Sequence, residues 1–183
     1  GSITLDDAHQ AFVEQIVALV DGGADVLIFK SFIDIAELEC AVRAATYVRA
    51  DIPIIALKTF PEDGSVLATS YPREIVERLT ALNVSCIGSN GTVGPQRMLS
   101  IVQSLGSPDI PLCALPDIGI PTITRGRPHY HADAAYVASV ARRLVEQGVQ
   151  IIGAEGGATH EVIAAIATEC RTAVISSSPV RMK

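Results

Sequence analysis

Short apolar runs alternate along this chain with longer segments of helical periodicity. The apolar runs are continuous stretches of Val, Ile, Leu and Ala, which is typical of parallel strands that are buried on both faces. They predict strands at residues 25–32, 53–60, 84–90, 111–116, 150–153 and 172–176.

The segments between these runs place their apolar residues on one stripe of a helix. They predict helices at residues 5–20, 35–48, 72–82, 95–105, 132–146 and 160–170. In the first helix Phe12, Ile16 and Leu19 share the stripe, and Gly22 follows as a stop signal. Thr159 is a suitable N-cap for the last helix.

The order of the elements is that of repeated strand–helix units, which predicts an α/β fold with a parallel sheet. The periodicity fits either a doubly wound open sheet or a piece of a (β/α)8 barrel. The longest irregular stretches, 61–70 and 117–131, each follow the carboxyl end of a strand. In both architectures that end of the sheet is the functional face.

Composition narrows the range of functions. With 183 residues, 19.3 kDa and 49% hydrophobic residues, we expect a single domain with a packed core. A net charge of −6, a pI of about 5.1 and the lack of Trp argue against nucleic-acid binding. No apolar run approaches the ~20 residues of a membrane span, and no signal peptide is recognisable at the N-terminus. We therefore expect a cytoplasmic protein with no membrane partner.

The four cysteines are widely spaced and include no C-x-x-C pair. They are Cys40, Cys86, Cys113 and Cys170. This spacing favours buried thiols of a cytoplasmic protein over a zinc knuckle or a disulfide framework.

Three strand-end motifs and one further strand carry a resemblance. Residues 84–96 read Val-Ser-Cys-Ile-Gly-Ser-Asn-Gly-Thr-Val-Gly-Pro-Gln, and residues 111–119, 151–159 and 25–32 supply the others. Together they resemble the homocysteine S-methyltransferase domain, particularly the form fused to a methylenetetrahydrofolate reductase. The motifs occur in the family's order across nearly the whole chain. The resemblance implies a TIM-barrel-type parallel sheet with sequential strand order, a partial barrel with about five of the family's eight strands.

The resemblance also implies a metal site. In the family three cysteinates hold a zinc ion that binds the homocysteine thiol and makes it a thiolate nucleophile. Here the three cysteine positions are Gly91, Glu155 and Gly156, and Lys30 stands at an acidic position of the family. Because one carboxylate does not make a zinc site, we predict no cofactor and no metal for this chain.

The same strand ends supply candidate substrate-pocket residues for a small thiol or amino-acid ligand. These are Lys30, Gly88, Asn90, Asp117, which replaces the family's Asn, and Glu155. The Gly-rich turn at 155–157 fits an anion cradle or a plain tight turn, and its acidic residue favours the turn.

Two other groups of residues leave alternatives open. Lys30 and Lys58 both lie near strand ends, where a lysine forms either a Schiff base or an ion pair with Glu155 or Asp117. His129 and His131 make a His-x-His pattern. That pattern binds metal on a strand, whereas here a loop that leads into a helix capped by His131 or Asp133 is the alternative.

The functional prediction is a single homocysteine S-methyltransferase-like domain over residues 3–183 that lacks the first strands of the barrel and zinc-dependent methyl transfer. The alternatives are an active methyltransferase with altered metal ligation and a lysine-based barrel enzyme. Because an incomplete barrel has uncovered sheet edges, we expect self-association or a role as a portion of a larger chain.

Overall fold

The computed structural model describes residues 3–60, 71–91, 94–119, 121–130 and 133–173. The helices are α1 (Leu5–Asp21), α2 (Ile35–Val48), α3 (Tyr71–Thr80), α4 (Pro95–Leu105), α5 (Ala134–Glu146) and α6 (His160–Cys170). The strands are β1 (Leu27–Phe32), β2 (Ile54–Lys58), β3 (Cys86–Asn90), β4 (Leu112–Leu115), β5 (Thr122–Thr124), β6 (Arg127–His129) and β7 (Val149–Ile152).

The main sheet is parallel and its strands follow one another in space in the order β1-β2-β3-β4-β7. A doubly wound sheet would reverse direction at a switch point. The order here never reverses, so the sheet is of the TIM-barrel type. This outcome confirms the fold class predicted from the motifs.

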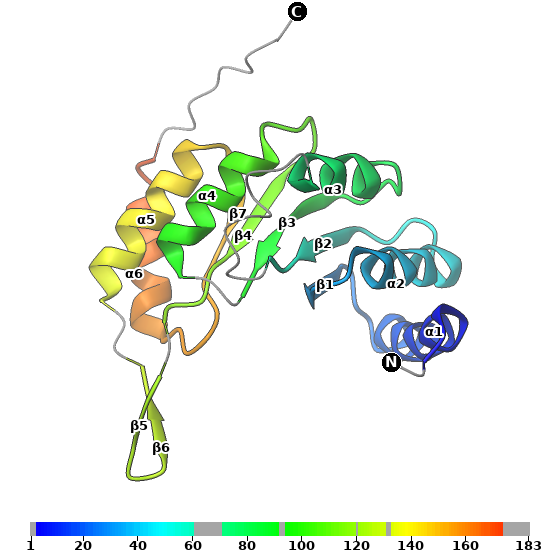
Figure 1. Cartoon of the computed structure of the whole chain (residues 1–183), viewed down its shortest axis with the longest axis horizontal. Coiled ribbons are helices and arrows are strands. Elements are labelled where there is room, and N and C mark those ends of the chain that lie inside the picture. The colour runs from blue at the N-terminus through cyan, green and yellow to red at the C-terminus, as the bar shows by residue number, and fades with distance from the viewer. Residues whose placement is uncertain (1–2, 61–70, 92–93, 120, 131–132, 174–183) are drawn as a thin grey trace, which may run out of the picture.

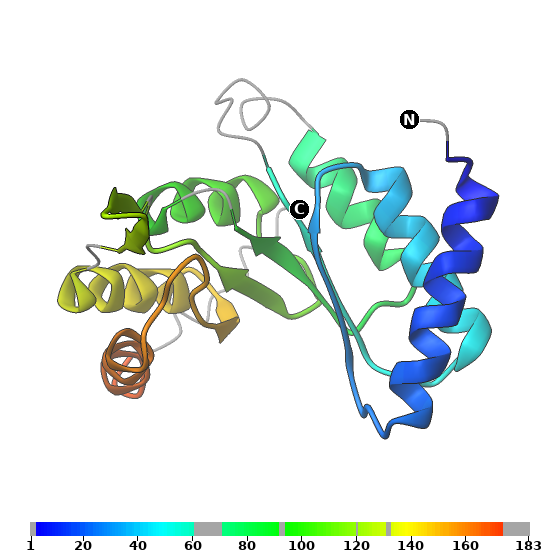
Figure 2. The ribbon, with the colours of Figure 1, turned by 90° about the horizontal axis from the view of Figure 1, so that it is seen from below.

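The helices line one side of the curved sheet and leave the other side open, as Figures 1 and 2 show. The main core lies between the helices and the outer face of the sheet. Strand residues such as Leu27, Ala56 and Ala114 pack there against helix residues such as Leu38 and Met98. We call the open, opposite side of the sheet the inner face.

The inner face carries a smaller apolar cluster and exposed apolar side chains. Leu57, Cys86 and Cys113 form the cluster. Ile28 is 54% exposed and Ile151, beside Cys113 in the register, is 39% exposed. Pairing leaves β1 at one edge of the sheet, and a groove of about 450 Å³ runs between that strand and α1. The expected self-association, which would cover such surfaces, stays a prediction.

Several boundaries and one element differ from the sequence-based expectation. Residues 117–131 include an antiparallel hairpin of β5 and β6, not a purely irregular stretch. Helix α5 begins at Ala134, with Asp133 as its N-cap. Of the strand expected at 172–176, residues 172 and 173 are not in a strand and the rest lies outside the described residues. Thr159 is the N-cap of α6 as expected, although its side chain makes no capping hydrogen bond.

Candidate active site

The carboxyl ends of β1, β3, β4 and β7 meet at one edge of the inner face. The pairing of β4 with β7 continues past the strands, because Asp117 and Glu155 form an isolated parallel bridge. The backbone N–H of Glu155 donates to the carbonyl of Pro116 at 2.9 Å, and that of Gly91 donates to the carbonyl of Leu115 at 3.0 Å. These backbone bonds bring residues more than 60 positions apart in sequence, such as Gly91 and Glu155, into one site.

An ion pair crosses this site. Lys30 Nζ donates to Glu155 Oε1 at 2.7 Å, and Asn90 Nδ2 donates to Glu155 Oε2 at 2.9 Å. The Lys30 side chain is 52% exposed and that of Glu155 is 17% exposed. Both carboxylate oxygens of Glu155 therefore accept hydrogen bonds. Lys30 forms the ion pair with Glu155 that was the alternative to a Schiff base at this lysine.

Asn90 is the buried centre of the site and is fully shielded from solvent. Its Oδ1 accepts from the backbone N–H of Ser31 at 2.8 Å and from Thr59 Oγ1 at 3.2 Å. Its Nδ2 also donates to Ser31 Oγ at 3.1 Å. The amide thus ties together the ends of β1 and β3 and the residue that follows β2, and it positions Glu155.

Sequence reasoning missed Ser31 and Thr59. Ser31 has a positive φ of 69°, which is uncommon for a residue other than glycine and is held here by its reciprocal bonds to Asn90. A signal was present in the sequence, because each is a polar residue at the carboxyl end of an apolar strand prediction.

The three positions that correspond to the family's cysteines lie close together. A Cβ at Gly91 would stand 3.8 Å from Glu155 Oε2, and a Cβ at Gly156 would stand 2.5 Å from Asp117 Oδ1. Both glycines have a positive φ, 63° at Gly91 and 52° at Gly156. The segment from 155 to 157 is a tight turn: the ring of Tyr130 occupies the space where a Cβ of Gly157 would lie.

These residues do not fit the zinc ion of the family. Glycine supplies no donor atom at two of the three positions, and the carboxylate at the third is bonded to Lys30 and Asn90. Over the described part of the chain, no group of three His, Cys, Asp or Glu side chains is arranged to hold a metal. His129 lies on the exposed strand β6, and its partner in the His-x-His pattern, His131, lies outside the described residues.

Gly88, another pocket candidate, has a packing role. A Cβ at this position would overlap the carbonyl group of Cys113 on β4. The close approach of β3 to β4 therefore requires glycine.

Lys58 is buried on the helix side of the sheet, away from the inner face. It shares a face of β2 with Ala56 of the main core and is 2% exposed. Its Nζ donates to the carbonyl of Thr59 at 2.7 Å and lies 4.9 Å from the centroid of the Phe60 ring. Burial lowers the pKa of Lys58, and the nearby Asp34 opposes this effect. Its position gives no support to the Schiff-base hypothesis, since a ligand on the inner face would not reach it.

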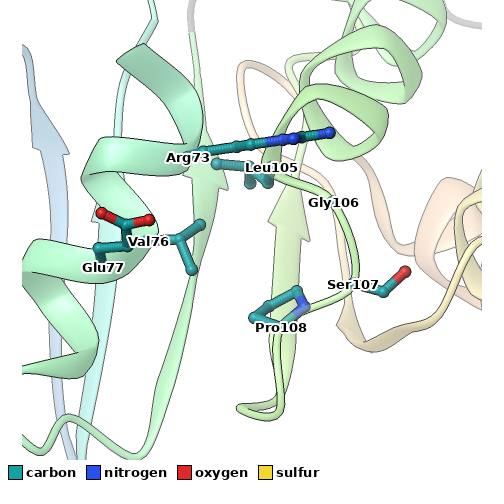
Figure 3. Close-up of a pocket in the computed structure, with 7 residues that line it drawn as sticks. All are labelled: Arg73, Val76, Glu77, Leu105, Gly106, Ser107 and Pro108. Carbon is teal, nitrogen blue, oxygen red and sulfur yellow. The ribbon is translucent and has the colours of Figure 1, made fainter. Parts of the chain in front are cut away.

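A cleft on the outer surface is separate from the site. It has a volume of about 440 Å³ and lies between α3 and the turn after α4. Figure 3 shows Arg73 extending across it towards Leu105, with Pro108 opposite Val76. None of its lining residues follows the carboxyl end of a strand, so it does not extend the candidate site.

Comparison with known proteins places the chain in a family. The family described as homocysteine S-methyltransferase matches residues 1–170. The chain belongs to this family. The resemblance read from the strand-end motifs is thereby confirmed.

Curated relatives include methionine synthases. That of Mycobacterium tuberculosis is 31% identical over 169 residues, which cover 87% of this chain and 14% of the methionine synthase. The methionine synthase of Mycobacterium leprae is 28% identical over 169 residues, which again cover 87% of this chain and 14% of that protein. The chain thus spans a small part of the length of these relatives.

Solved structures show the same fold. The apo form of the homocysteine methyltransferase MmuM from Escherichia coli matches with a TM-score of 0.73 at 18% identity, over 91% of this chain and 58% of that one. Its metallated form matches with a TM-score of 0.66 at 20% identity, over 87% of this chain and 51% of that one.

In the described part of our chain, no helix is long and apolar enough to cross a membrane.

Proposed function

We propose that this chain is a homocysteine S-methyltransferase-family domain in which an ion-pair network replaces the zinc site. It binds a small amino-acid or thiol ligand at the inner face and does not carry out zinc-dependent methyl transfer. The observation that carries the proposal is the bonding of Glu155, at a cysteine position of the family, to Lys30 and Asn90.

The chemistry of the donor set supports this proposal. Activation of a thiol by zinc requires a metal held by several protein ligands with one position open for substrate. Gly91 and Gly156 offer no side-chain donor, and metal binding by Glu155 would leave the Lys30 ammonium without its partner. A thiol that enters this site meets no group on the three positions that would stabilise its thiolate.

The network has a charge that suits the carboxylate of an amino-acid ligand. Lys30 is half exposed and offers its ammonium group to that carboxylate. Asp117 lies next to Glu155 in the sheet and adds a negative charge close to the site. The four free cysteines are typical of a cytoplasmic protein, where such small metabolites are abundant.

Restoring the ligands tests the replacement of the zinc site. The variant carries Lys30→Glu, Gly91→Cys, Glu155→Cys and Gly156→Cys, and the matched control retains Gly91. Only the complete variant should show thiolate-to-cobalt(II) charge-transfer absorption. Only this variant should also retain one zinc per chain. Asp117 has to shift to admit a side chain at position 156.

Two results would count against the proposal. Tight zinc binding by the unaltered chain that Glu155→Gln abolishes would show that the site is a metal site. No metal binding by the complete variant would show that the three positions do not converge.

Ligand binding needs a separate measurement. Isothermal titration with homocysteine and with methionine should show binding that Lys30→Ala weakens by about tenfold, the loss of about 1.4 kcal/mol. Lys30→Arg, which keeps the charge, is the control. Equal affinities for all three proteins would refute the role of Lys30, and no binding by any would refute the ligand class.

A further inference from the structure

Two thiols meet on the inner face, below the ion-pair network. Cys86 on β3 and Cys113 on β4 are each 2% exposed, and they form a cluster with Leu57. Ile55 and Leu115 pack around the cluster. The other two cysteines lie elsewhere, on α2 and at the end of α6.

The two side chains lie on neighbouring strands, on the same face of the sheet and in one cluster. Hydrogen bonding to Cys113 lowers the pKa of Cys86, because a thiolate there would accept the proton of Cys113, and the same interaction raises the pKa of Cys113. Cys86 Sγ also contacts the carbonyl of Ile87 at 3.5 Å. The neutral pair holds two protons.

The backbone positions disfavour a disulfide between these sulfurs. Cys113 pairs with Gly88, so Cys86 stands two residues away along β3, in a diagonal position. Diagonal neighbours in a sheet are about 7–8 Å apart. A disulfide needs Cα atoms closer than about 7 Å. Both strands are interior to the sheet and are fixed by their neighbours.

We infer that the Cys86–Cys113 pair is a binding site for a monovalent soft cation, Cu(I), which bridges the two sulfurs. Thiolate sulfur favours soft metals, Cu(I) and zinc among them. Two sulfur donors suit a cation that accepts two-coordinate geometry, whereas zinc requires four ligands and the surrounding side chains are apolar.

The charge balance of the site favours this cation. One Cu(I) enters and one of the two thiol protons leaves to solvent, so the pair remains neutral overall, with one thiolate and one thiol on the metal. No oxidation occurs. A divalent ion would reach neutrality only by displacing both protons, and two sulfurs would still leave zinc short of the four ligands that it takes.

Competition with a chromophoric Cu(I) chelator under anaerobic conditions tests the inference. The reference protein carries Cys40→Ser and Cys170→Ser, which leave only the inner-face pair. It should bind one Cu(I) per chain as tightly as the unaltered chain does. Adding Cys86→Ser or Cys113→Ser should weaken binding roughly 100-fold or more, since one of two ligands is lost.

A second readout does not depend on how well these variants fold. In the unaltered chain, held in urea just below its unfolding midpoint so that the buried thiols react, Cu(I) should slow the alkylation of Cys86 and Cys113 relative to the metal-free protein. The rate at Cys170 should not change, as read by peptide mass spectrometry. Protection of Cys170 or Cys40 instead, or Cu(I) binding that persists when both inner-face cysteines are replaced by serine, would overturn the inference. Failure to bind Cu(I) at all would overturn it without affecting the proposed zinc-free site, which uses none of these residues.

Discussion

Replacement of Asn90 by alanine is expected to destabilise the fold strongly, because this side chain joins three strand ends. The amide takes part in four hydrogen bonds, two with Ser31 and one each with Thr59 and Glu155. Thr59 retains a second acceptor, the backbone carbonyl of residue 90, and Glu155 retains Lys30. The backbone N–H of Ser31 loses its acceptor, and its positive φ loses the contact that holds it.

The magnitude follows from these contacts. Typical hydrogen bonds contribute about 1 kcal/mol each, and a buried donor left without a partner costs about 1–3 kcal/mol, so we expect a total loss of about 3 kcal/mol. For a chain of this size that lowers Tm by about 6–12 °C. Urea unfolding followed by circular dichroism should show a lower midpoint with an unchanged slope.

The matched control is Gln103→Ala, an exposed position on α4, which should change stability by less than about 0.5 kcal/mol. A loss below about 1 kcal/mol for Asn90→Ala would refute the view that this amide holds the site together.

Three further changes probe other parts of the fold. Because burial lowers the pKa of Lys58 from 10.5, the unfolded chain binds more protons and stability rises with pH up to that value. Lys58→Met should therefore stabilise the protein by about 1–2 kcal/mol at pH 7. The difference in thermal midpoint between this variant and the unaltered chain should narrow as pH rises, and a difference that widens would contradict this reasoning. Gly88→Ala should lower the urea midpoint sharply or prevent folding, whereas Gly94→Ala, where a Cβ meets open space, should be tolerated; equal midpoints would refute the close approach of the strands. If the chain self-associates through its free edge, Ile28→Lys should shift the mass seen by light scattering towards the monomer, while Tyr47→Lys, at an exposed position of α2, leaves it unchanged. A monomer at all concentrations before any change would end that prediction.

The order and type of the main strands were predictable because they read as continuous apolar runs. β2 and β3 are buried on both faces through most of their length. β1 and β7 keep apolar side chains on the inner face as well, although Ile28 and Ile151 are exposed there. The hairpin of β5 and β6 was missed since β5 is exposed throughout and presents no apolar run. Its signal lay in the turn instead: Arg125 and Gly126 both have a positive φ, as a two-residue hairpin loop requires.

The site was predictable in its positions and less so in its bonding. Lys30 and Glu155 could be placed together because one lies near the carboxyl end of a parallel strand and the other follows such an end, although 125 residues separate them. The roles of Ser31 and Thr59 depend on strand register and on one positive φ, which no pattern in a single sequence reveals. The placement of Lys58 on the helix side likewise follows from strand alternation in the actual register.

Zinc stoichiometry of the purified, unaltered chain is the most direct test of the central claim that an ion-pair network replaces the metal site. The protein would be equilibrated with zinc, dialysed against a weak chelator and measured by elemental analysis at a known protein concentration. We predict a negligible zinc content that Glu155→Gln does not change. About one zinc per chain, lost on that substitution, would contradict the account and return the chain to the metal-dependent chemistry of its family.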